Sequence, residues 1–301
     1  MPTVPLFSAW PEVREKLKAA PGVLLGVDFD GTLAPIALWP DLAVLPGETR
    51  DALRRLAVRP GVEVAVISGR GLDDLKNRVG LPGLTYGANH GLEIERGGSL
   101  WTHPMVPQAT ATMTRIEAAL RPVVRHVPGA LLDPKQTTLT IHYRQVKSPR
   151  NAKMLKEVVQ ATIQPWLDRG EIRVTGGKML IELRPNTPWA KGHALAFLLA
   201  PPGRSPEGPR GPDAMGVQAA EAIALDASGA YTGPRDGRLA LYAGDDQTDE
   251  DGFKAIAAFG LTVKVGSPTA PTAARYQVWS PVEVRAFLER VAEELGTGHG
   301  N

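Results

Sequence analysis

Four short apolar runs, each ending abruptly in polar residues, constrain the fold of this 301-residue chain more than any other feature. A continuous apolar run is typical of a central parallel strand, because such a strand is buried on both faces of its sheet. Helical segments fall between the runs, and this alternation indicates an open, doubly wound α/β sheet. The predicted strands are Val23–Val27, Val62–Ile67, Leu239–Ala243 and Leu261–Val265. The predicted helices are Ser8–Ala20, with Ser8 as its N-cap, Gly47–Val58, Leu72–Val79 and Asp249–Ala258.

The middle of the chain follows a different pattern, with two longer helices and several short strands. The helices are expected at Gln108–Arg125 and Ala152–Leu167, and strands within Leu131–Arg144 and at Glu171–Thr175 and Lys178–Arg184, the last two around a turn at Gly176-Gly177. We therefore expect an α+β domain over residues 107–184, inserted into a Rossmann-like core formed by 1–106 and 185–301. A Pro- and Gly-rich stretch at 201–237, around a helical patch at 217–225, is expected to be a surface insertion without chemistry.

Composition and charge exclude several classes of protein. The net charge is only +2 and the Lys and Arg residues form no long run, which argues against a nucleic-acid binder. The sequence contains no cysteine, so disulfides, thiolate metal sites and cysteine nucleophiles are excluded. We expect neither a signal peptide nor a membrane span, and a monomeric protein of the cytoplasm.

Carboxylates directly follow two of the four predicted strands. Asp28 and Asp30 come after the first strand, and a cluster beginning with Gly244-Asp245-Asp246 comes after the third. The carboxyl ends of parallel strands form the ligand-binding edge of such a sheet. There one carboxylate can attack phosphorus, a second can act as general acid and base, and the cluster can share Mg²⁺, which prefers oxygen ligands. The alternative is that these residues only cap helices, where Asp is favoured.

Two further side chains could complete a phosphate site. Ser68 ends the second strand, where its hydroxyl and nearby backbone N–H groups can bind a phosphoryl oxygen. Lys191 begins a helix just after the inserted domain, where its ammonium group can neutralise both a phosphate and a nucleophilic carboxylate. Alone, Ser68 would be an ordinary turn residue and Lys191 an ordinary surface residue. The evidence for a phosphate site is the order of four elements along the chain, namely the Asp28 and Asp30 pair, Ser68, Lys191 and the acidic cluster.

In that order the four elements resemble the haloacid-dehalogenase-like phosphohydrolase superfamily. The resemblance implies that Asp28 is the nucleophile and Asp30 the general acid and base, with Ser68 and Lys191 binding phosphate. It also implies that the cofactor is Mg²⁺, held by Asp28, the backbone carbonyl of Asp30 and Asp245, with support from Asp246 and Asp249.

The strands of the inserted domain narrow the expected substrate. Alternation places Thr140, His142 and Arg144 on one face of one strand, and Lys178 and Glu182 on one face of another. Such faces are often merely solvated, but a polyol substrate needs them, because carboxylates accept and Lys and Arg donate hydrogen bonds.

Several motifs together resemble the trehalose-6-phosphate phosphatase family more closely. They are Ser68-Gly69-Arg70, Asn89-His90-Gly91, Asp133-Pro134-Lys135, His142-Tyr143-Arg144, Lys178 with Glu182, and the acidic cluster through Asp251. The resemblance implies a sugar-recognition cap and the substrate-binding residues Gly69, Arg70, His90, Asp133, Lys135, Arg144, Lys178 and Glu182. At position 133 that family favours Glu, so Asp133 is a departure.

The expected activity is therefore Mg²⁺-dependent hydrolysis of trehalose 6-phosphate through an aspartyl phosphate, with a functional link to trehalose-phosphate synthase. Three alternatives stay open from the residues alone. The substrate could be another glycosyl phosphate, such as sucrose 6-phosphate or a mannosyl- or glucosyl-3-phosphoglycerate. The protein could instead transfer phosphate between sugars as a mutase, or bind a sugar phosphate without catalysis.

Overall fold

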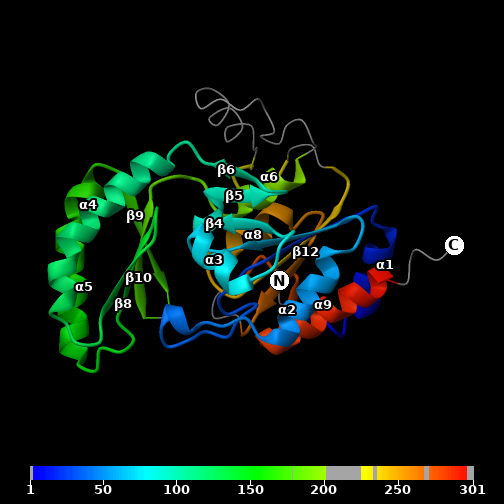
Figure 1. Cartoon of the computed structure of the whole chain (residues 1–301), viewed down its shortest axis with the longest axis horizontal. Helices are drawn as coiled ribbons and strands as arrows, with labels where there is room; N and C mark the ends of the chain where they lie inside the picture. Colours follow the sequence, from blue (N-terminus) through cyan, green and yellow to red (C-terminus); the bar gives the residue numbers. More distant parts are fainter. Residues whose placement is uncertain (1–2, 178, 201–224, 233–235, 268–270, 297–301) are drawn as a thin grey trace. The chain divides into compact units, whose positions relative to one another are not determined.

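The computed structural model describes residues 3–177, 179–200, 225–232, 236–267 and 271–296 (Figure 1). The chain divides into two compact units. The core unit comprises Met1–His103 and Trp189–Asn301, and the inserted unit comprises Pro104–Pro188. The sequence-based expectation for the inserted domain was residues 107–184. Most of the Pro- and Gly-rich stretch, including the expected helical patch, and the predicted site residue Lys178 lie outside the described residues.

The core unit is built on a nine-stranded sheet in the order β1-β13-β12-β11-β2-β3-β4-β5-β6. Its strands are β1 (Val4–Pro5), β2 (Val23–Val27), β3 (Val62–Ile67), β4 (Thr85–Ala88), β5 (Glu93–Arg96), β6 (Ser99–Thr102), β11 (Leu239–Gly244), β12 (Leu261–Val265) and β13 (Tyr276–Val278). All pairs from β1 to β4 are parallel, whereas β5 and β6 are antiparallel. Strand order runs one way from β2 and the other way from β11, so the topology switches between these two neighbours. The doubly wound α/β fold is confirmed.

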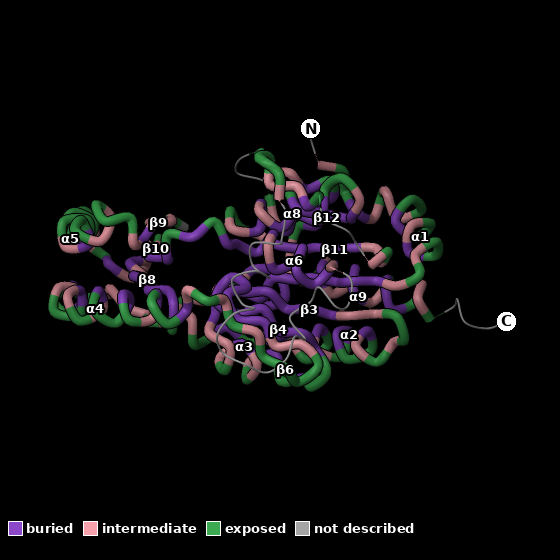
Figure 2. The backbone as a smooth tube through the Cα atoms, turned by 90° about the horizontal axis from the view of Figure 1, so that it is seen from above, coloured by how far each residue is buried: buried purple, intermediate pink, exposed green. Residues whose placement is uncertain are grey.

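Helices cover this sheet on both faces. They are α1 (Trp10–Ala19), α2 (Gly47–Ala57), α3 (Leu72–Val79), α6 (Lys191–Leu199), α8 (Glu250–Ile256) and α9 (Pro281–Gly296), with short 3₁₀ turns η1 (Pro40–Leu42) and η2 (Asn89–Gly91). In β2, Val23, Leu25 and Val27 share a buried cluster with residues of α1, α2, α3 and α9. Gly26 faces the other side, where a Cβ would lie 2.8 Å from Cδ2 of Leu195 in α6. Burial on both faces explains the continuous apolar run (Figure 2).

The inserted unit is an antiparallel sheet packed against two helices. The strand order is β7 (Leu131–Pro134), β8 (Leu139–His142), β10 (Leu180–Pro185) and β9 (Ile172–Gly177). Helices α4 (Val106–Arg125) and α5 (Pro149–Asp168) share one buried apolar cluster with β8 and β10. The other face of the sheet is therefore the one available for polar side chains.

Two local predictions were wrong. The first helix begins at Trp10, and its N-cap is Ala9, which makes no capping hydrogen bond from a side chain. Ser8 is therefore not the N-cap of this helix. Gly176 and Gly177 belong to β9, and Gly177 pairs with Leu180, so the chain reverses after them. Met179 lies in that reversal with φ +66° and is exposed, and it therefore does not contribute to the apolar face of β10.

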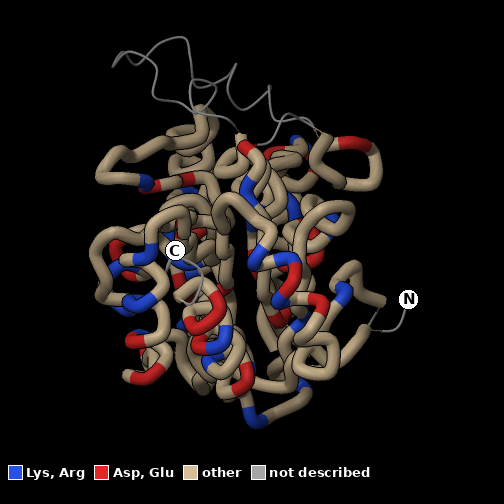
Figure 3. Tube along the Cα trace, turned by 90° about the vertical axis from the view of Figure 1, so that its right-hand side faces the viewer, with Lys and Arg blue, Asp and Glu red and all other residues tan. Residues whose placement is uncertain are grey.

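Figure 3 shows Lys and Arg interspersed with Asp and Glu on the side of the molecule that faces the viewer. This distribution agrees with the small net charge. Among the described residues, no helix combines the length and the apolar character that crossing a membrane requires.

An aromatic cluster lies in the core unit near the two chain crossings into the inserted unit. It contains Trp101, His103, Trp189, His193 and Phe197, with ring centroids 4.9 Å apart for His103 and Trp189. Burial, with His193 nearby, lowers the pKa of His103 to about 4. The folded protein therefore holds His103 neutral in a pH range in which the unfolded chain protonates it.

Stability should consequently fall as the pH is lowered from about 6.5 to about 4, because the unfolded state binds the additional proton. Since His103 is only partly buried, solvent screening reduces its effect, and we expect it to lower the free energy of unfolding by on the order of 1 kcal/mol over this pH range. Urea unfolding at pH 7 and pH 5 measures this loss. His103→Gln should reduce it, whereas His126→Gln, at an exposed position, should not. Equal pH dependence in wild type and His103→Gln would show that His103 is not responsible.

Candidate active site

The sequence-predicted core residues meet at the point where the sheet topology switches. Asp28 directly follows β2, and Asp245 directly follows β11, its parallel neighbour. Lys191 is the first residue of α6, and Ser68 directly follows β3. In open α/β sheets, ligands bind at such a switch point, outside the carboxyl ends of the strands.

Lys191 joins two buried carboxylates of this site. Its Nζ donates to Oδ1 of Asp28 at 2.8 Å and to Oδ1 of Asp249 at 2.7 Å. The hydroxyl of Tyr242 in β11 also donates to Oδ1 of Asp249, at 2.6 Å, and the backbone N–H of Asp246 donates to Oδ2. Lys191 is 2% exposed and Asp28 is 4% exposed. The sequence pattern did not identify Tyr242, because it lies within an apolar run.

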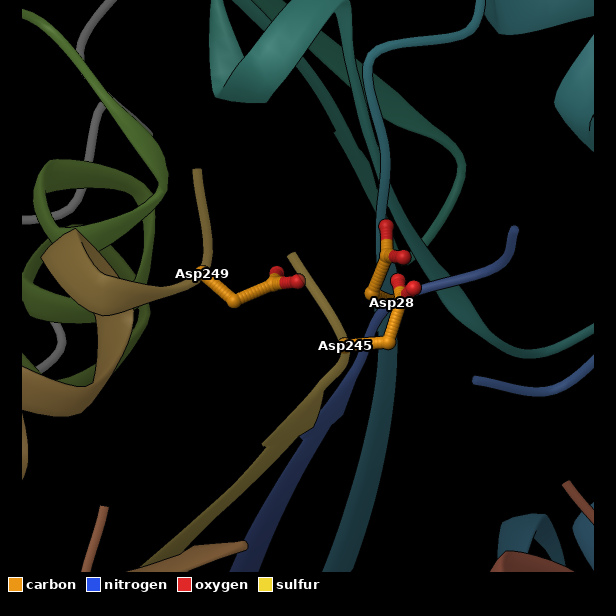
Figure 4. Close-up of side chains that lie close together, drawn as sticks. All are labelled: Asp28, Asp245 and Asp249. Carbon is orange, nitrogen blue, oxygen red and sulfur yellow. The ribbon is translucent and has the colours of Figure 1, made fainter. Parts of the chain in front are cut away.

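Three carboxylates converge beside this lysine (Figure 4). Asp28, Asp245 and Asp249 offer oxygen atoms that all lie within 4.8 Å of one another. Gly31 makes the convergence possible, because a Cβ at this position would lie 2.3 Å from Oδ2 of Asp245. Gly31 also has φ +85°, which a residue with a side chain rarely adopts.

Electrostatics in this cluster favour an additional cation. Burial raises the pKa of Asp28, and the neighbouring Asp249 and Asp245 raise it further, against the opposing effect of Lys191. Burial likewise raises the pKa of Asp249. Burial disfavours the charged form of Lys191, but Asp249 and Asp28 raise its pKa overall, so it stays protonated. One ammonium group among three close carboxylates leaves negative charge, and oxygen donors of this kind fit Mg²⁺.

Asp30 lies beside this cluster and is held by Arg70. Arg70 donates from Nε to Oδ2 and from Nη2 to Oδ1 of Asp30, both at 2.7 Å. Its remaining donors reach Oδ2 of Asp74 at 2.6 Å and the carbonyl oxygen of Pro40 at 2.9 Å. Burial works against the charge of Arg70, but Asp30 and Asp74 raise its pKa. The guanidinium group of Arg70, a predicted substrate-binding residue, thus binds protein acceptors in this structure.

Ser68, Gly69 and His90 form the neighbouring loop wall. Ser68 is buried, and its Oγ accepts a hydrogen bond from the backbone N–H of Arg70 at 3.3 Å. A Cβ at Gly69 would lie 2.7 Å from the His90 ring, so the absence of a side chain admits the imidazole. Asn89 and His90 have φ values of +50° and +60°. A non-glycine pair in this region is strained, which is common where a site must hold side chains in place.

The remaining acidic residues after β11 serve different contacts. Oδ1 of Asp246 accepts from the backbone N–H and the hydroxyl of Thr248. Glu250 binds the hydroxyl of Thr272 and the backbone N–H of Ala273, each at 2.8 Å. Asp246, a predicted supporting residue, therefore orders its own turn, and Glu250 binds Thr272 and Ala273 and is not one of the three converging carboxylates.

In the inserted unit, the predicted sugar-binding residues Asp133 and Glu182 lie in strands, on the sheet face opposite the helices. Strand register aligns Asp133, Thr140, Glu182 and Thr175 in one row across the four strands. Oε2 of Glu182 accepts from the Thr175 hydroxyl at 3.1 Å. Oδ2 of Asp133 lies 4.0 Å from Nζ of Lys135 and 3.4 Å from Nε2 of His142.

Arg144 follows β8 and is half-buried. The inserted unit thus presents a row of acceptors with cationic neighbours, the complement of a polyol.

Comparison with known proteins identifies the family of the chain. Residues 26–281 match the model of the trehalose-phosphatase family. The chain belongs to this family. Among curated relatives of the family, trehalose 6-phosphate phosphatase RA3 of Zea mays is 31% identical over 96% of the chain and 75% of its own length. Trehalose-phosphate phosphatase of Mycobacterium tuberculosis is also 31% identical, over 96% of the chain and 67% of its own length.

Solved structures share the fold of this trehalose-phosphatase family member. The C-terminal domain of Candida albicans trehalose-6-phosphate phosphatase has a TM-score of 0.77 at 22% identity, with 97% of the chain and 99% of that domain covered. The C-terminal domain of the Candida albicans trehalose synthase regulatory protein has a TM-score of 0.71 at 14% identity, with 96% and 100% covered. At these identities the likeness shows the fold alone.

Proposed function

We propose that this protein removes the phosphate group from trehalose 6-phosphate, releasing trehalose and inorganic phosphate, with Mg²⁺ as cofactor. The observation that carries the proposal is the meeting of Asp28, Lys191 and two further carboxylates at the switch point of the sheet, in a chain of the trehalose-phosphatase family. The carboxylate of Asp28 supplies a nucleophile, and Lys191 supplies a fixed positive charge beside it.

In the first half of the reaction, an oxygen of Asp28 forms a bond to phosphorus, and the bond between phosphorus and the sugar oxygen breaks. Asp30 gives its proton to that oxygen, so free trehalose leaves and an aspartyl phosphate remains. In the second half, Asp30 takes a proton from water, and the water oxygen attacks phosphorus and restores Asp28. Inorganic phosphate is released.

The metal and the phosphate-binding groups assist both halves. Asp28, Asp245 and the Asp30 backbone carbonyl would hold Mg²⁺, supported by Asp249 and Asp246, and the bound ion would neutralise phosphoryl charge. Ser68 and Lys191 bind phosphoryl oxygens. Arg70 donates one hydrogen bond to each oxygen of Asp30, and each oxygen keeps a second lone pair that can carry the transferred proton.

Recognition of the disaccharide is assigned to the inserted unit. Asp133 and Glu182 accept hydrogen bonds from sugar hydroxyls, and Lys135 and Arg144 donate to them. Lys178, outside the described residues, is proposed as a further donor from the sequence motif. Gly69 and His90 contribute from the core unit. Cytoplasmic localisation, a monomeric state and the link to trehalose-phosphate synthase stay predictions.

A panel of sugar phosphates tests the proposed function. Phosphate release in the presence of Mg²⁺ is measured for trehalose 6-phosphate, sucrose 6-phosphate, mannosyl- and glucosyl-3-phosphoglycerate and glucose 6-phosphate. We expect the highest kcat/KM for trehalose 6-phosphate. A higher value for another compound would reassign the substrate, and a phosphorylated sugar isomer without free phosphate would indicate a mutase. No release from any compound would indicate a module that binds a sugar phosphate without catalysis.

Glu182→Ala tests the assignment of sugar recognition. Loss of its hydrogen bonds to sugar should cost about 1–3 kcal/mol, which lowers kcat/KM for trehalose 6-phosphate about 5- to 150-fold. Hydrolysis of p-nitrophenyl phosphate, which requires only the core unit, should change little. Glu157→Ala, on the exposed side of α5, is the matched control. Equal losses on both substrates would show that Glu182 supports the fold, through contacts such as that with Thr175.

A further inference from the structure

Lys264 is a buried lysine for which the reaction described above has no role. It lies in β12, is 7% exposed and is paired in register with Gly244, the last residue of β11. Its Nζ donates to the backbone carbonyl oxygen of Asp245 at 2.7 Å and to that of Asp246 at 3.2 Å. A buried ammonium group that donates to two successive carbonyl oxygens fixes the chain at that point.

The charge of Lys264 is balanced inside the core unit. A carboxylate oxygen of Glu250 lies 3.9 Å from its Nζ, and Glu250 is itself held by Thr272 and Ala273. Lys264 thus has a carboxylate neighbour and two carbonyl acceptors within the protein. These contacts favour a role for Lys264 in holding the loop after β11, rather than in direct binding of substrate.

The peptide group between Asp245 and Asp246 is held at both ends. Its carbonyl oxygen accepts from Lys264, and its N–H donates to Oδ2 of Asp249 at 3.0 Å. This peptide group follows the Cα of Asp245 directly, so fixing it restricts the backbone from which the Asp245 side chain extends. Asp245 is one of the three converging carboxylates, and Asp249, which holds the other end, is another.

We propose that Lys264 is a positioning residue for the cation site, which it preorganises by fixing the peptide group that follows Asp245. The inference rests on the proposed function in so far as the cation is Mg²⁺. Residues outside the ligand set that orient metal ligands typically contribute about 10- to 100-fold to metal affinity.

A positioning role and a purely electrostatic role predict opposite results. Lys264 is a cation near an acidic cluster, so removing its charge alone would strengthen Mg²⁺ binding. Loss of the two hydrogen bonds would release the Asp245 loop and weaken binding. Lys264→Met removes both the charge and the donors, while Lys264→Arg retains both. Lys254→Met, at an exposed position of α8, is the control for loss of one positive charge.

The experiment is calorimetric titration of Mg²⁺ into the full-length, chelator-treated protein, which does not depend on activity. We expect about 10-fold weaker binding in Lys264→Met, recovery of most of the affinity in Lys264→Arg and no change in Lys254→Met. Unchanged or tighter binding in Lys264→Met would overturn the proposal. Failure of the wild type to bind Mg²⁺ would instead contradict the proposed cofactor.

Kinetics provide a second measurement. In Lys264→Met the Mg²⁺ concentration for half-maximal rate should rise about 10-fold. At saturating Mg²⁺, kcat and the KM for the sugar phosphate should stay within about twofold, because the ion restores the site. A general folding defect would lower kcat at every Mg²⁺ concentration and would contradict the positioning role. If Lys264→Met does not fold, Lys264→Gln, which keeps a donor but shortens the side chain, must show the same rise.

Discussion

Asp28→Asn lowers phosphate release from trehalose 6-phosphate by at least about 10³-fold, because an amide oxygen cannot replace the carboxylate as nucleophile. The variant should still fold. Burial and neighbouring carboxylates raise the pKa of Asp28, so the charged form is costly in the folded protein and a neutral side chain removes that cost. Lys191 retains its ion pair with Asp249. Single-turnover phosphate release and urea unfolding are the two measurements.

The control for this substitution is Asp51→Asn, on the exposed side of α2, which should leave turnover unchanged. Substrate binding should survive in Asp28→Asn, since the sugar contacts and Ser68 are intact. Turnover within tenfold of wild type would rule out Asp28 as the nucleophile. Loss of folding in this variant would contradict the electrostatic account of the cluster.

Lys191→Met removes the cation that two buried carboxylates share, and we expect large losses in both stability and activity. Removing one partner of a buried ion pair lowers the free energy of unfolding by about 3–5 kcal/mol. In this variant Asp28 and Asp249 would be left buried without the ammonium group that they share. Loss of a fixed charge beside the phosphoryl group should lower kcat about 10²- to 10³-fold. Mg²⁺ should return part of the stability, because it binds the folded state.

The stability loss in Lys191→Met should depend on pH with a defined sign. Burial raises the pKa of Asp28 and Asp249, and removal of Lys191 raises both pKa values further. A carboxyl group whose folded pKa exceeds its unfolded pKa loses stabilisation as the pH rises through the folded value. The variant should therefore be more impaired at pH 8 than at pH 5 in urea unfolding. Lys76→Met, which removes a surface pair with Glu95, should cost at most about 1 kcal/mol. If Lys191→Met lowers the free energy of unfolding by an equally small amount at both pH values, the ion-pair network of Lys191, Asp28 and Asp249 does not stabilise the fold in the way described.

The local pattern of apolar residues was sufficient to predict the central strands and helices of the core unit. Strands β2, β3 and β12 and helix α3 have the predicted bounds, and β11 is one residue longer. Each of these strands is flanked by helices, so its burial shows directly as an uninterrupted apolar run. Strands β4, β5 and β6 were not predicted, because each is only four residues long and the outer two are partly exposed. In the sheet only β4 pairs with β3, while β5 pairs with β4 and β6 with β5, so their placement depends on pairing between strands rather than on an apolar run.

The order of motifs in the sequence determined the family and the residue types of the site, because a strand followed by carboxylates places them at the edge of a parallel sheet. Only the tertiary structure decided which acidic residues face one another. By residue pattern alone Asp245, Asp246, Asp249 and Glu250 are equivalent, and only the family resemblance distinguished Asp245 as a ligand with Asp246 and Asp249 in support. In the structure Asp245 and Asp249 converge on Asp28, while Asp246 binds Thr248 and Glu250 binds Thr272 and Ala273.

The partners of Arg70 and Lys264 were likewise invisible in the sequence. Arg70 binds Asp30 across 40 residues of chain, and Lys264 reaches the carbonyl oxygen of Asp245 from the neighbouring strand. Local pattern reports which residues are buried and in which element they lie, since both depend on residues close in sequence. Hydrogen-bond partners across the sheet depend on strand register and crossover connections, which exist only once the whole chain has packed.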